Sequence, residues 1–101
     1  MKVTVEAPQF DPDVKLIEFI QKKLNKLEQF YDKIIHADVF LKLEPNSKPE
    51  NKIVEILVSV PGDEFIVKKS AKSFEEGTDV CVQSLERVLI KRKEKIRANI
   101  S

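Results

Sequence analysis

Basic side chains are the residues whose number and spacing could do chemistry in this sequence. Arg87, Lys91 and Lys95 follow one another at four-residue steps, with Arg92 and Lys93 beside them. Like charges at this spacing on a helix cost a few tenths of a kcal/mol for each pair. A solvated helix end that favours cations explains two or three such residues, but not the whole group. We therefore interpret the group as a surface for a polyanion.

The charge of the chain is unevenly distributed. The net charge is only +1, yet the segment from Arg87 to Arg97 holds six basic residues and one acidic residue, a local charge of +5. A second group of lysines lies at helical spacing earlier in the chain. If the two helices pack side by side, their basic stripes merge into one ridge roughly 20 Å long. The predicted RNA-binding set is Lys22, Lys23, Lys26, Arg87, Lys91, Arg92, Lys93 and Lys95.

Aromatic residues that could stack on bases are scarce in the sequence. Phe19, Phe30 and Tyr31 lie near the first lysine group, and we assign them to packing. Stacking needs exposed rings among the cations. The sequence therefore predicts recognition through shape and phosphate contacts, with little reading of bases.

Residue types needed for catalysis or for metal binding are few. Cys81 and His36 are the only cysteine and histidine, so neither a disulfide nor a zinc cluster can form within the chain. Gly62 and Gly77 are the only glycines, too few for a phosphate-binding loop. We expect no enzyme activity, cofactor, metal or small-molecule substrate, a buried thiol at Cys81, and a surface or capping role for His36.

Length and hydropathy indicate one domain that covers residues 1–101. The chain is 42% hydrophobic, enough for one core, and its first residues alternate apolar and polar types without the apolar run of a secretory signal. Nor does any stretch approach the roughly 20 apolar residues that cross a bilayer. We expect a soluble, cytoplasmic protein without a membrane partner.

Hydrophobic spacing predicts six elements. A strand around Val3 and Val5 precedes a helix that Asp11 caps, with a buried stripe from Ile17 to Tyr31 and an end near Lys33. Alternating residues predict strands over 37–43, 52–60 and 64–70, joined as an antiparallel meander. Ser73 and Glu76 form a capping box that opens a second long helix.

The order β-α-β-β-β-α predicts the α+β class, a four-stranded sheet with two helices packed on one face. Phe40, Ile53, Leu57 and Ile66 fall on the other face by alternation. Scattered apolar residues are common on protein surfaces, but a contiguous patch could bind a partner. An interaction module that self-associates weakly or binds a protein through this face is the alternative function.

Two segments carry a resemblance to a known family. Residues 26–34, KLEQFYDKI, resemble the end of the first helix in ribosome hibernation promoting factors and the related ribosome-associated inhibitors. Residues 85–95, LERVLIKRKEK, resemble their basic C-terminal helix. The order and spacing of the strands between them also fit, so the resemblance covers nearly all of the chain from Met1 to Arg97.

The resemblance implies a fold like that of a double-stranded-RNA-binding domain, in a short, single-domain member. It implies a partner, the small ribosomal subunit with its rRNA, bound over the A and P sites so that tRNA and messenger are excluded in stress or stationary phase. By position, the family places basic groups toward rRNA at every member of the predicted set except Lys22, which rests on helix geometry alone.

The segment 73–79, SFEEGTD, departs from the family pattern. Many members have a sequence of the DMYAAID type there, and Glu75 stands where they have tyrosine. The sequence therefore leaves open any contact that the tyrosine makes. It also leaves open whether the protein promotes or prevents ribosome dimers, because the segments associated with either effect are not found in these 101 residues.

Overall fold

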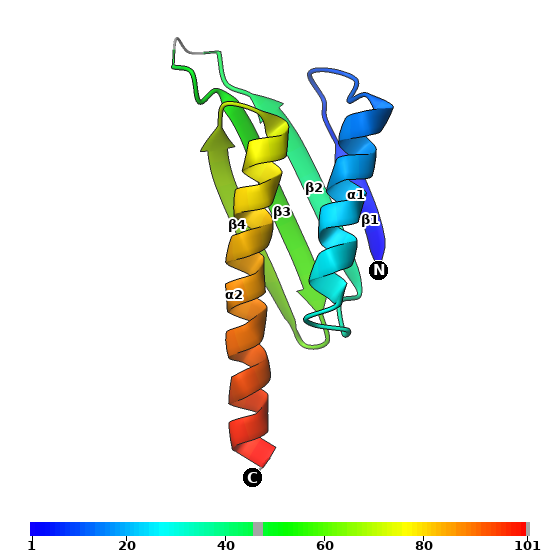
Figure 1. The fold of residues 1–101 in the computed structure, drawn as a ribbon, viewed down its shortest axis with the longest axis vertical. Coiled ribbons are helices and arrows are strands. Elements are labelled where there is room, and N and C mark those ends of the chain that lie inside the picture. The colour runs from blue at the N-terminus through cyan, green and yellow to red at the C-terminus, as the bar shows by residue number, and fades with distance from the viewer. Residues whose placement is uncertain (46–47, 101) are drawn as a thin grey trace.

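Six elements follow one another in the order that the sequence predicts (Figure 1). The structure is a computed structural model that describes residues 1–45 and 48–100, without the side chains of 97–100. The elements are β1 (Lys2–Glu6), α1 (Val14–Glu28), β2 (His36–Leu43), β3 (Lys52–Val60), β4 (Asp63–Ala71) and α2 (Phe74–Ile100). The α+β class is confirmed.

The four strands form one sheet in the order β1-β2-β3-β4. β1 runs parallel to β2, which is possible because α1 carries the chain back across the sheet between them. β2, β3 and β4 form the predicted antiparallel meander, and Gly62 makes its second turn possible with a φ of +81°. Both helices lie on the same face of the sheet (Figure 1), as the sequence predicts.

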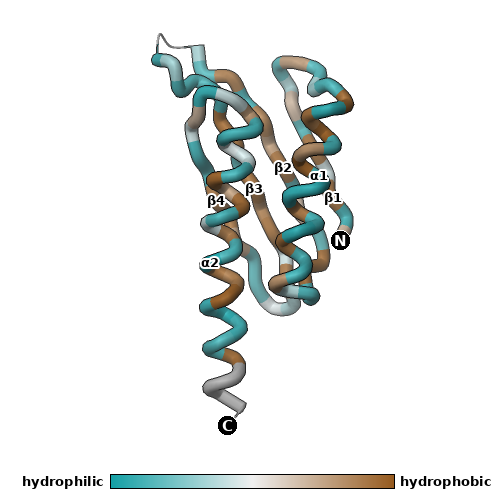
Figure 2. The backbone as a smooth tube through the Cα atoms, in the orientation of Figure 1, coloured by the Kyte–Doolittle hydropathy of each residue, from teal (hydrophilic) through white to brown (hydrophobic). Residues whose placement is uncertain are grey.

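The core lies between this helical layer and the sheet. Val39 and Ile56, neighbours across β2 and β3, are fully buried. Leu24 from α1 and Leu85 from α2 are fully buried above them. In Figure 2 hydrophobic colour predominates along β2 and β3, while the two helices alternate between hydrophobic and hydrophilic segments. The helices are therefore amphipathic, and their outer surfaces remain available to a partner.

The first helix is shorter than predicted at both ends. Its N-cap is Asp13, whose Oδ1 accepts a hydrogen bond from the N–H of Leu16 at 2.8 Å, so the prediction of Asp11 as the cap was wrong. The helix ends at Glu28 because the N–H groups of Phe30 and Tyr31 both donate to the carbonyl of Leu27, which closes the last turn. The prediction of an end near Lys33 was also wrong.

The second helix lies close to the sheet at its start. The N–H of Glu76 donates to Ser73 Oγ at 3.1 Å, as a capping box requires, while the carboxylate of Glu76 accepts from the N–H of Lys72. A Cβ atom at Gly77 would lie 2.6 Å from Cγ2 of Val54. Glycine therefore allows the close approach of α2 to β3. The C-terminal part of α2 extends past the end of the sheet (Figure 1).

The opposite face of the sheet carries a smaller apolar patch than the alternation suggests. Leu57 and Ile66 lie opposite each other on β3 and β4, and Phe40 lies on β2. Ile66 is 62% exposed, but Ile53 is only 3% exposed, although it points away from the helices. Polar residues such as Asp38 and Glu55 lie in the same rows. The exposed apolar surface is therefore interrupted by charge.

Candidate nucleic-acid interface

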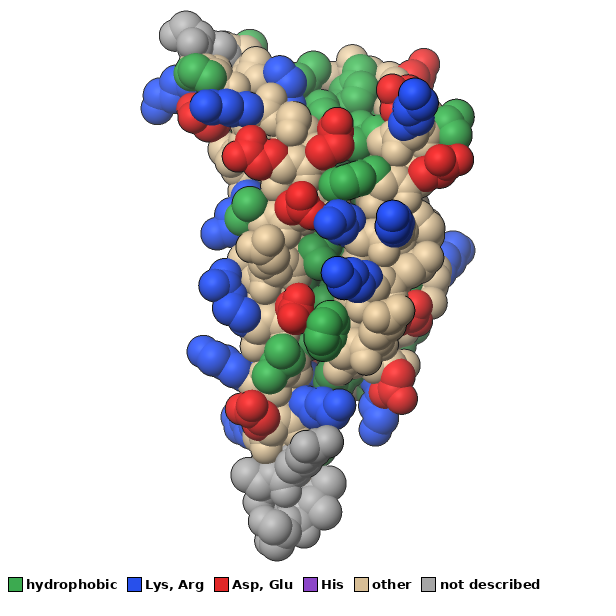
Figure 3. Space-filling model, viewed as in Figure 1, with side chains coloured by type: hydrophobic (Ala, Val, Ile, Leu, Met, Phe, Trp, Pro, Cys, Tyr) green, Lys and Arg blue, Asp and Glu red, His purple; other side chains and the backbone are tan. Residues whose placement is uncertain are grey.

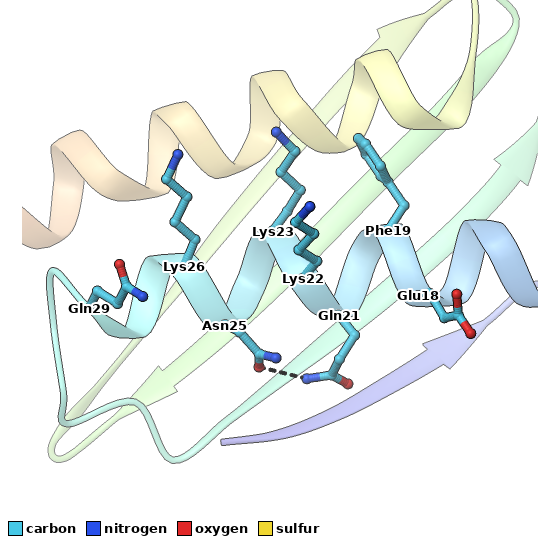
Figure 4. Close-up of a pocket in the computed structure, with 8 residues that line it drawn as sticks. All are labelled: Glu18, Phe19, Gln21, Lys22, Lys23, Asn25, Lys26 and Gln29. Carbon is cyan, nitrogen blue, oxygen red and sulfur yellow. Dashed lines mark hydrogen bonds between the residues drawn. The ribbon is translucent and has the colours of Figure 1, made fainter.

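Three lysines of the predicted set gather on the outer surface of α1. Lys22, Lys23 and Lys26 line one open hollow, with Phe19, Glu18 and polar residues around them (Figure 4). The side chains of Lys23 and Lys26 point toward α2 in this view, and Lys22 stands beside them. Because the described structure gives Lys22 and Lys26 no acidic partner, both ammonium groups are available to an anion.

Lys23 is partly engaged within the protein. Its ammonium group lies 2.8 Å from Oδ1 of Asp79 on α2, and 5.4 Å from the centre of the Phe19 ring. Both side chains of the ion pair are about one-third to two-fifths exposed, so the contact is worth at most about 1 kcal/mol in water. Lys23 therefore links the two helices and offers only part of its charge to a ligand.

The basic stripe of α2 lies apart from the α1 lysines. Arg87, Lys91 and Lys95 are exposed. Next to Lys23 and Lys26, the flank of α2 that faces α1 carries Asp79 and Glu86 instead. Successive residues lie about 100° apart around a helix, and Arg87 directly follows Glu86. The stripe that begins at Arg87 therefore lies on a different side of α2 from Glu86.

Figure 3 shows the same separation on the surface. Blue side chains gather over α1 and along the outer edge of α2, with red and green side chains between the helices. The prediction that the two stripes merge into one ridge was therefore wrong. The sequence places the cations on two helices, but the rotation of each helix directs them to two separate surfaces.

Arg92 belongs to a structural network and not to the exposed cations. Its Nε donates to the Tyr31 hydroxyl at 3.2 Å, and its Nη2 to the Pro61 carbonyl at 2.9 Å. Its Nη1 lies 3.0 Å from Oδ2 of Asp63, and the Phe65 ring centre is 5.9 Å away. The guanidinium group thus ties α2 to the turn between β3 and β4. The assignment of Arg92 to the RNA-binding set needs correction for this reason.

Lys93 lies near the end of α1. It lines a small hollow with Tyr31, Asp32, Lys33 and Ile96, on the flank of α2 that faces α1. Lys33 adds a cation that the sequence analysis did not select. Arg97, which contributes to the basic count of the sequence, has its side chain outside the described residues.

Two aromatic rings, those of Phe19 and Phe30, flank the α1 lysines. The sequence analysis assigned both to packing and not to the candidate site. Phe30 is 40% exposed, whereas its neighbour Tyr31 is only 7% exposed. Phe19, Lys23 and Lys26 are spaced by four and three residues, so they occupy one flank of α1. Phe30 follows the end of the helix and lines one hollow with Lys23 and Lys26. The spacing was visible in the sequence, but the rings were grouped with the buried stripe next to them. Tyr31 is buried as assigned, Phe19 is partly buried, and the assignment of Phe30 to packing was wrong.

Cys81 and His36 lie where the sequence predicts. Cys81 is fully buried, with Sγ 3.5 Å from the Val54 carbonyl, and burial raises the pKa of the thiol to about 11. His36 is at the surface, and its Nε2 lies 3.5 Å from Oδ2 of Asp38 on the same strand. Among residues 1–45 and 48–96, no His, Cys, Asp and Glu side chains gather into a group that could hold a metal. None of the helices described could span a membrane.

Solved structures share this fold. A ribosomal subunit interface protein from Coxiella burnetii superposes with a TM-score of 0.82, covering 93% of this chain and 99% of that chain at 22% identity. The N-terminal domain of protein Y from Thermus thermophilus gives a TM-score of 0.78, covering 90% of this chain and 98% of that chain at 22% identity. The arrangement of one sheet and two helices is therefore a known one.

Sequence comparison identifies the family. A ribosome hibernation promoting factor from Azotobacter vinelandii is 30% identical over 95 residues, which are 94% of this chain and 85% of the relative. One from Pseudomonas putida is 28% identical over 95 residues, 94% of this chain and 89% of the relative. The model of the family described as Sigma 54 modulation protein / S30EA ribosomal protein matches residues 3–97. The chain belongs to this family, that of the ribosome hibernation promoting factors.

Proposed function

We propose that the protein binds the small ribosomal subunit at its decoding region and blocks the A and P sites to tRNA and messenger. It acts as a single domain in the cytoplasm, as a steric inhibitor that catalyses no reaction. The observation that carries the proposal is the lysine group of α1, Lys22, Lys23 and Lys26, on a chain of this family. The names of its relatives, ribosome hibernation promoting factor and ribosomal subunit interface protein, support a ribosomal partner.

Phosphate contacts supply the affinity in this mechanism. Ribosomal RNA carries a dense array of phosphates, and lysine or arginine side chains that contact them release condensed counterions. The α1 lysines form one contact surface, and Arg87, Lys91 and Lys95 on α2 form a second. Two separated cationic surfaces suit a protein that is wedged between two RNA elements, because each surface then contacts phosphates of its own.

Charge reversal at both surfaces tests the proposal. The variant Lys26→Glu, Lys91→Glu, Lys95→Glu should lose co-sedimentation with small subunits, because it removes cations from both surfaces. A matched control reverses Lys2, Lys42 and Lys68, which project from the opposite face of the sheet. Both variants change the net charge by the same amount. The control should still bind, because its lysines lie away from the two proposed contact surfaces.

Two further measurements complete this test. Circular dichroism melts of both variants should stay close to that of the unmodified protein, because the six lysines are on the surface. Small subunits already loaded with messenger and P-site tRNA should bind the protein poorly. Undiminished binding of the Lys26, Lys91, Lys95 variant would contradict the proposed surfaces, and simultaneous binding with tRNA would contradict the proposed location.

Self-association through the uncovered sheet face is the alternative function. The observation in its favour is Ile66, 62% exposed beside the half-buried Leu57. A dimer in light scattering that persists in high salt and is lost in Ile66→Asp, without affinity for small subunits, would favour this alternative. Polar residues in the same rows as the apolar ones argue against a large dry interface there.

A further inference from the structure

The groove between α1 and α2 has a composition unlike that of a phosphate site. It is lined by Lys23, Lys26 and Leu27 from α1, by Phe30 from the turn after α1, and by Asp79, Val82, Gln83 and Glu86 from α2. Two carboxylates would repel phosphate. Asp79 is neutralised by Lys23, but among the residues described Glu86 takes part in no ion pair. The groove therefore combines an aromatic ring, a free hydrogen-bond acceptor and a nearby cation.

Phe30 is accessible because of how α1 ends. The hydrogen bonds from Phe30 and Tyr31 to the Leu27 carbonyl turn the chain after Glu28, with Tyr31 buried and Phe30 40% exposed. Burying the rest of that ring would be favourable, yet no part of the chain that the structure describes covers it. A flat apolar group from a ligand could do so.

We propose that this groove binds one unpaired RNA base, stacked on Phe30, with an exocyclic amino group donating to the Glu86 carboxylate. Lys26, which lines the same groove as Phe30, would contact the adjoining phosphate. Bases stack on exposed aromatic rings in many RNA-binding proteins, and carboxylates accept hydrogen bonds from amino groups such as cytosine N4. The groove, of about 210 Å³, is smaller than a drug-sized pocket, which suits one base of a larger ligand.

This inference deepens the proposed function, on which its ribosomal setting rests. It replaces the expectation that recognition uses shape and phosphate with little base reading. It also assigns different contacts to two neighbouring surfaces. The outer surface of α1 contacts phosphates, and the groove selects an unpaired base that carries an amino group, as adenine and cytosine do and uracil does not.

A tryptophan at position 30 would report stacking directly, because the chain contains no other tryptophan. The fluorescence of Phe30→Trp should be quenched by oligocytidylate and oligoadenylate at low salt, and much less by oligouridylate. Ile66→Trp on the uncovered sheet face is the control, and its fluorescence should not change. Equal, absent or control-like quenching at position 30 would overturn the inference, whether or not ribosomes bind.

Small subunits provide the second part of the experiment. Phe30→Leu keeps an apolar side chain but removes the ring, so it should weaken binding at least about fivefold with an unchanged melting temperature. Glu86→Gln should reduce the preference for cytosine and adenine over uracil. If Phe30→Leu binds like the unmodified protein, the base site is wrong but the proposed function stands. If the unmodified protein fails to bind subunits, the proposed function is wrong, and the oligonucleotide titration still decides the base site.

Discussion

Arg87 and Arg92 show how one side-chain type takes two roles on the same helix. Arg87 is exposed, and its contact within the protein is a 3.4 Å hydrogen bond to Ser84. Arg92 binds the Tyr31 hydroxyl, the Pro61 carbonyl and the Asp63 carboxylate. The planar guanidinium group presents five N–H donors in a fixed fork, so it reaches acceptors in separate directions, whereas the three donors of a lysine share one nitrogen atom. A basic residue in a sequence is therefore not evidence of a free cation.

Replacing Arg92 should destabilise the protein. Arg92→Ala leaves the Tyr31 hydroxyl, at a partly buried site, without its donor and removes an exposed ion pair, so the free energy of unfolding should fall by about 1 to 2 kcal/mol. Arg87→Ala is the matched control on the same helix and should change stability by less than about 0.5 kcal/mol. Urea denaturation measures both. Equal stability of the two variants would contradict the structural role of Arg92.

At the scale of elements, the contact between α2 and β3 depends on the absence of a side chain. Glycine in a helix costs about 1 kcal/mol relative to alanine, so Gly77 looks unfavourable in isolation. The Val54 side chain occupies the space that a Cβ atom would need. Because Gly77 has no side chain, the start of α2 can lie against the sheet. This contact in turn sets the direction of the rest of the helix along α1.

Gly77→Ala should therefore lower stability despite its better helix propensity. Overpacking typically costs about 1 to 3 kcal/mol, more than the propensity gain, so we expect a net loss on the order of 1 kcal/mol. Val54→Ala is itself destabilising because Val54 is fully buried, but in that background the clash is absent, so adding Gly77→Ala should cost less than it does in the unmodified protein. Thermal and urea denaturation compare the variants. An increase in stability for Gly77→Ala alone would show that α2 can shift away from β3 freely.

At the scale of the whole molecule, a nearly neutral protein presents two cationic surfaces on one side. Lys22 and Lys26 on α1 and the stripe of α2 lie on the helical layer, while the uncovered sheet face mixes charges of both signs. The net charge of +1 therefore underestimates the local positive charge that these surfaces present to a polyanion. The distribution also predicts which face of the protein meets the ribosome.

Salt dependence tests this distribution quantitatively. If about five cations contact phosphates, the logarithm of the binding constant for small subunits should fall against the logarithm of salt concentration with a slope of about −3.5 to −4.5. Reversal of Lys2, Lys42 and Lys68 on the sheet face should leave the slope almost unchanged. Neutralising Lys22, Lys23 and Lys26 to Gln should reduce its magnitude by about 2 to 3. A slope near zero for the unmodified protein would rule out phosphate contacts as the source of affinity.

The sequence by itself determined the elements and their order. Alternation in β2 and β3, the helical spacing of Leu24 and Leu85, and the capping pair of Ser73 and Glu76 are local patterns, and local patterns report backbone conformation. The strand boundaries of β3 were correct for the same reason. The family resemblance also depended on short contiguous segments, and the comparisons confirmed it.

Tertiary structure decided which side chains remain available to a ligand. The rotation of α2 about its axis separated the Arg87 stripe from the α1 lysines, and a turn far away in sequence captured Arg92. The early end of α1 exposed Phe30 while it buried Tyr31. These outcomes depend on packing between segments that are far apart in the sequence. Patterns among neighbouring residues do not report that packing. For this reason the sequence indicated where basic residues cluster along the chain, and the fold defined the surfaces that they form.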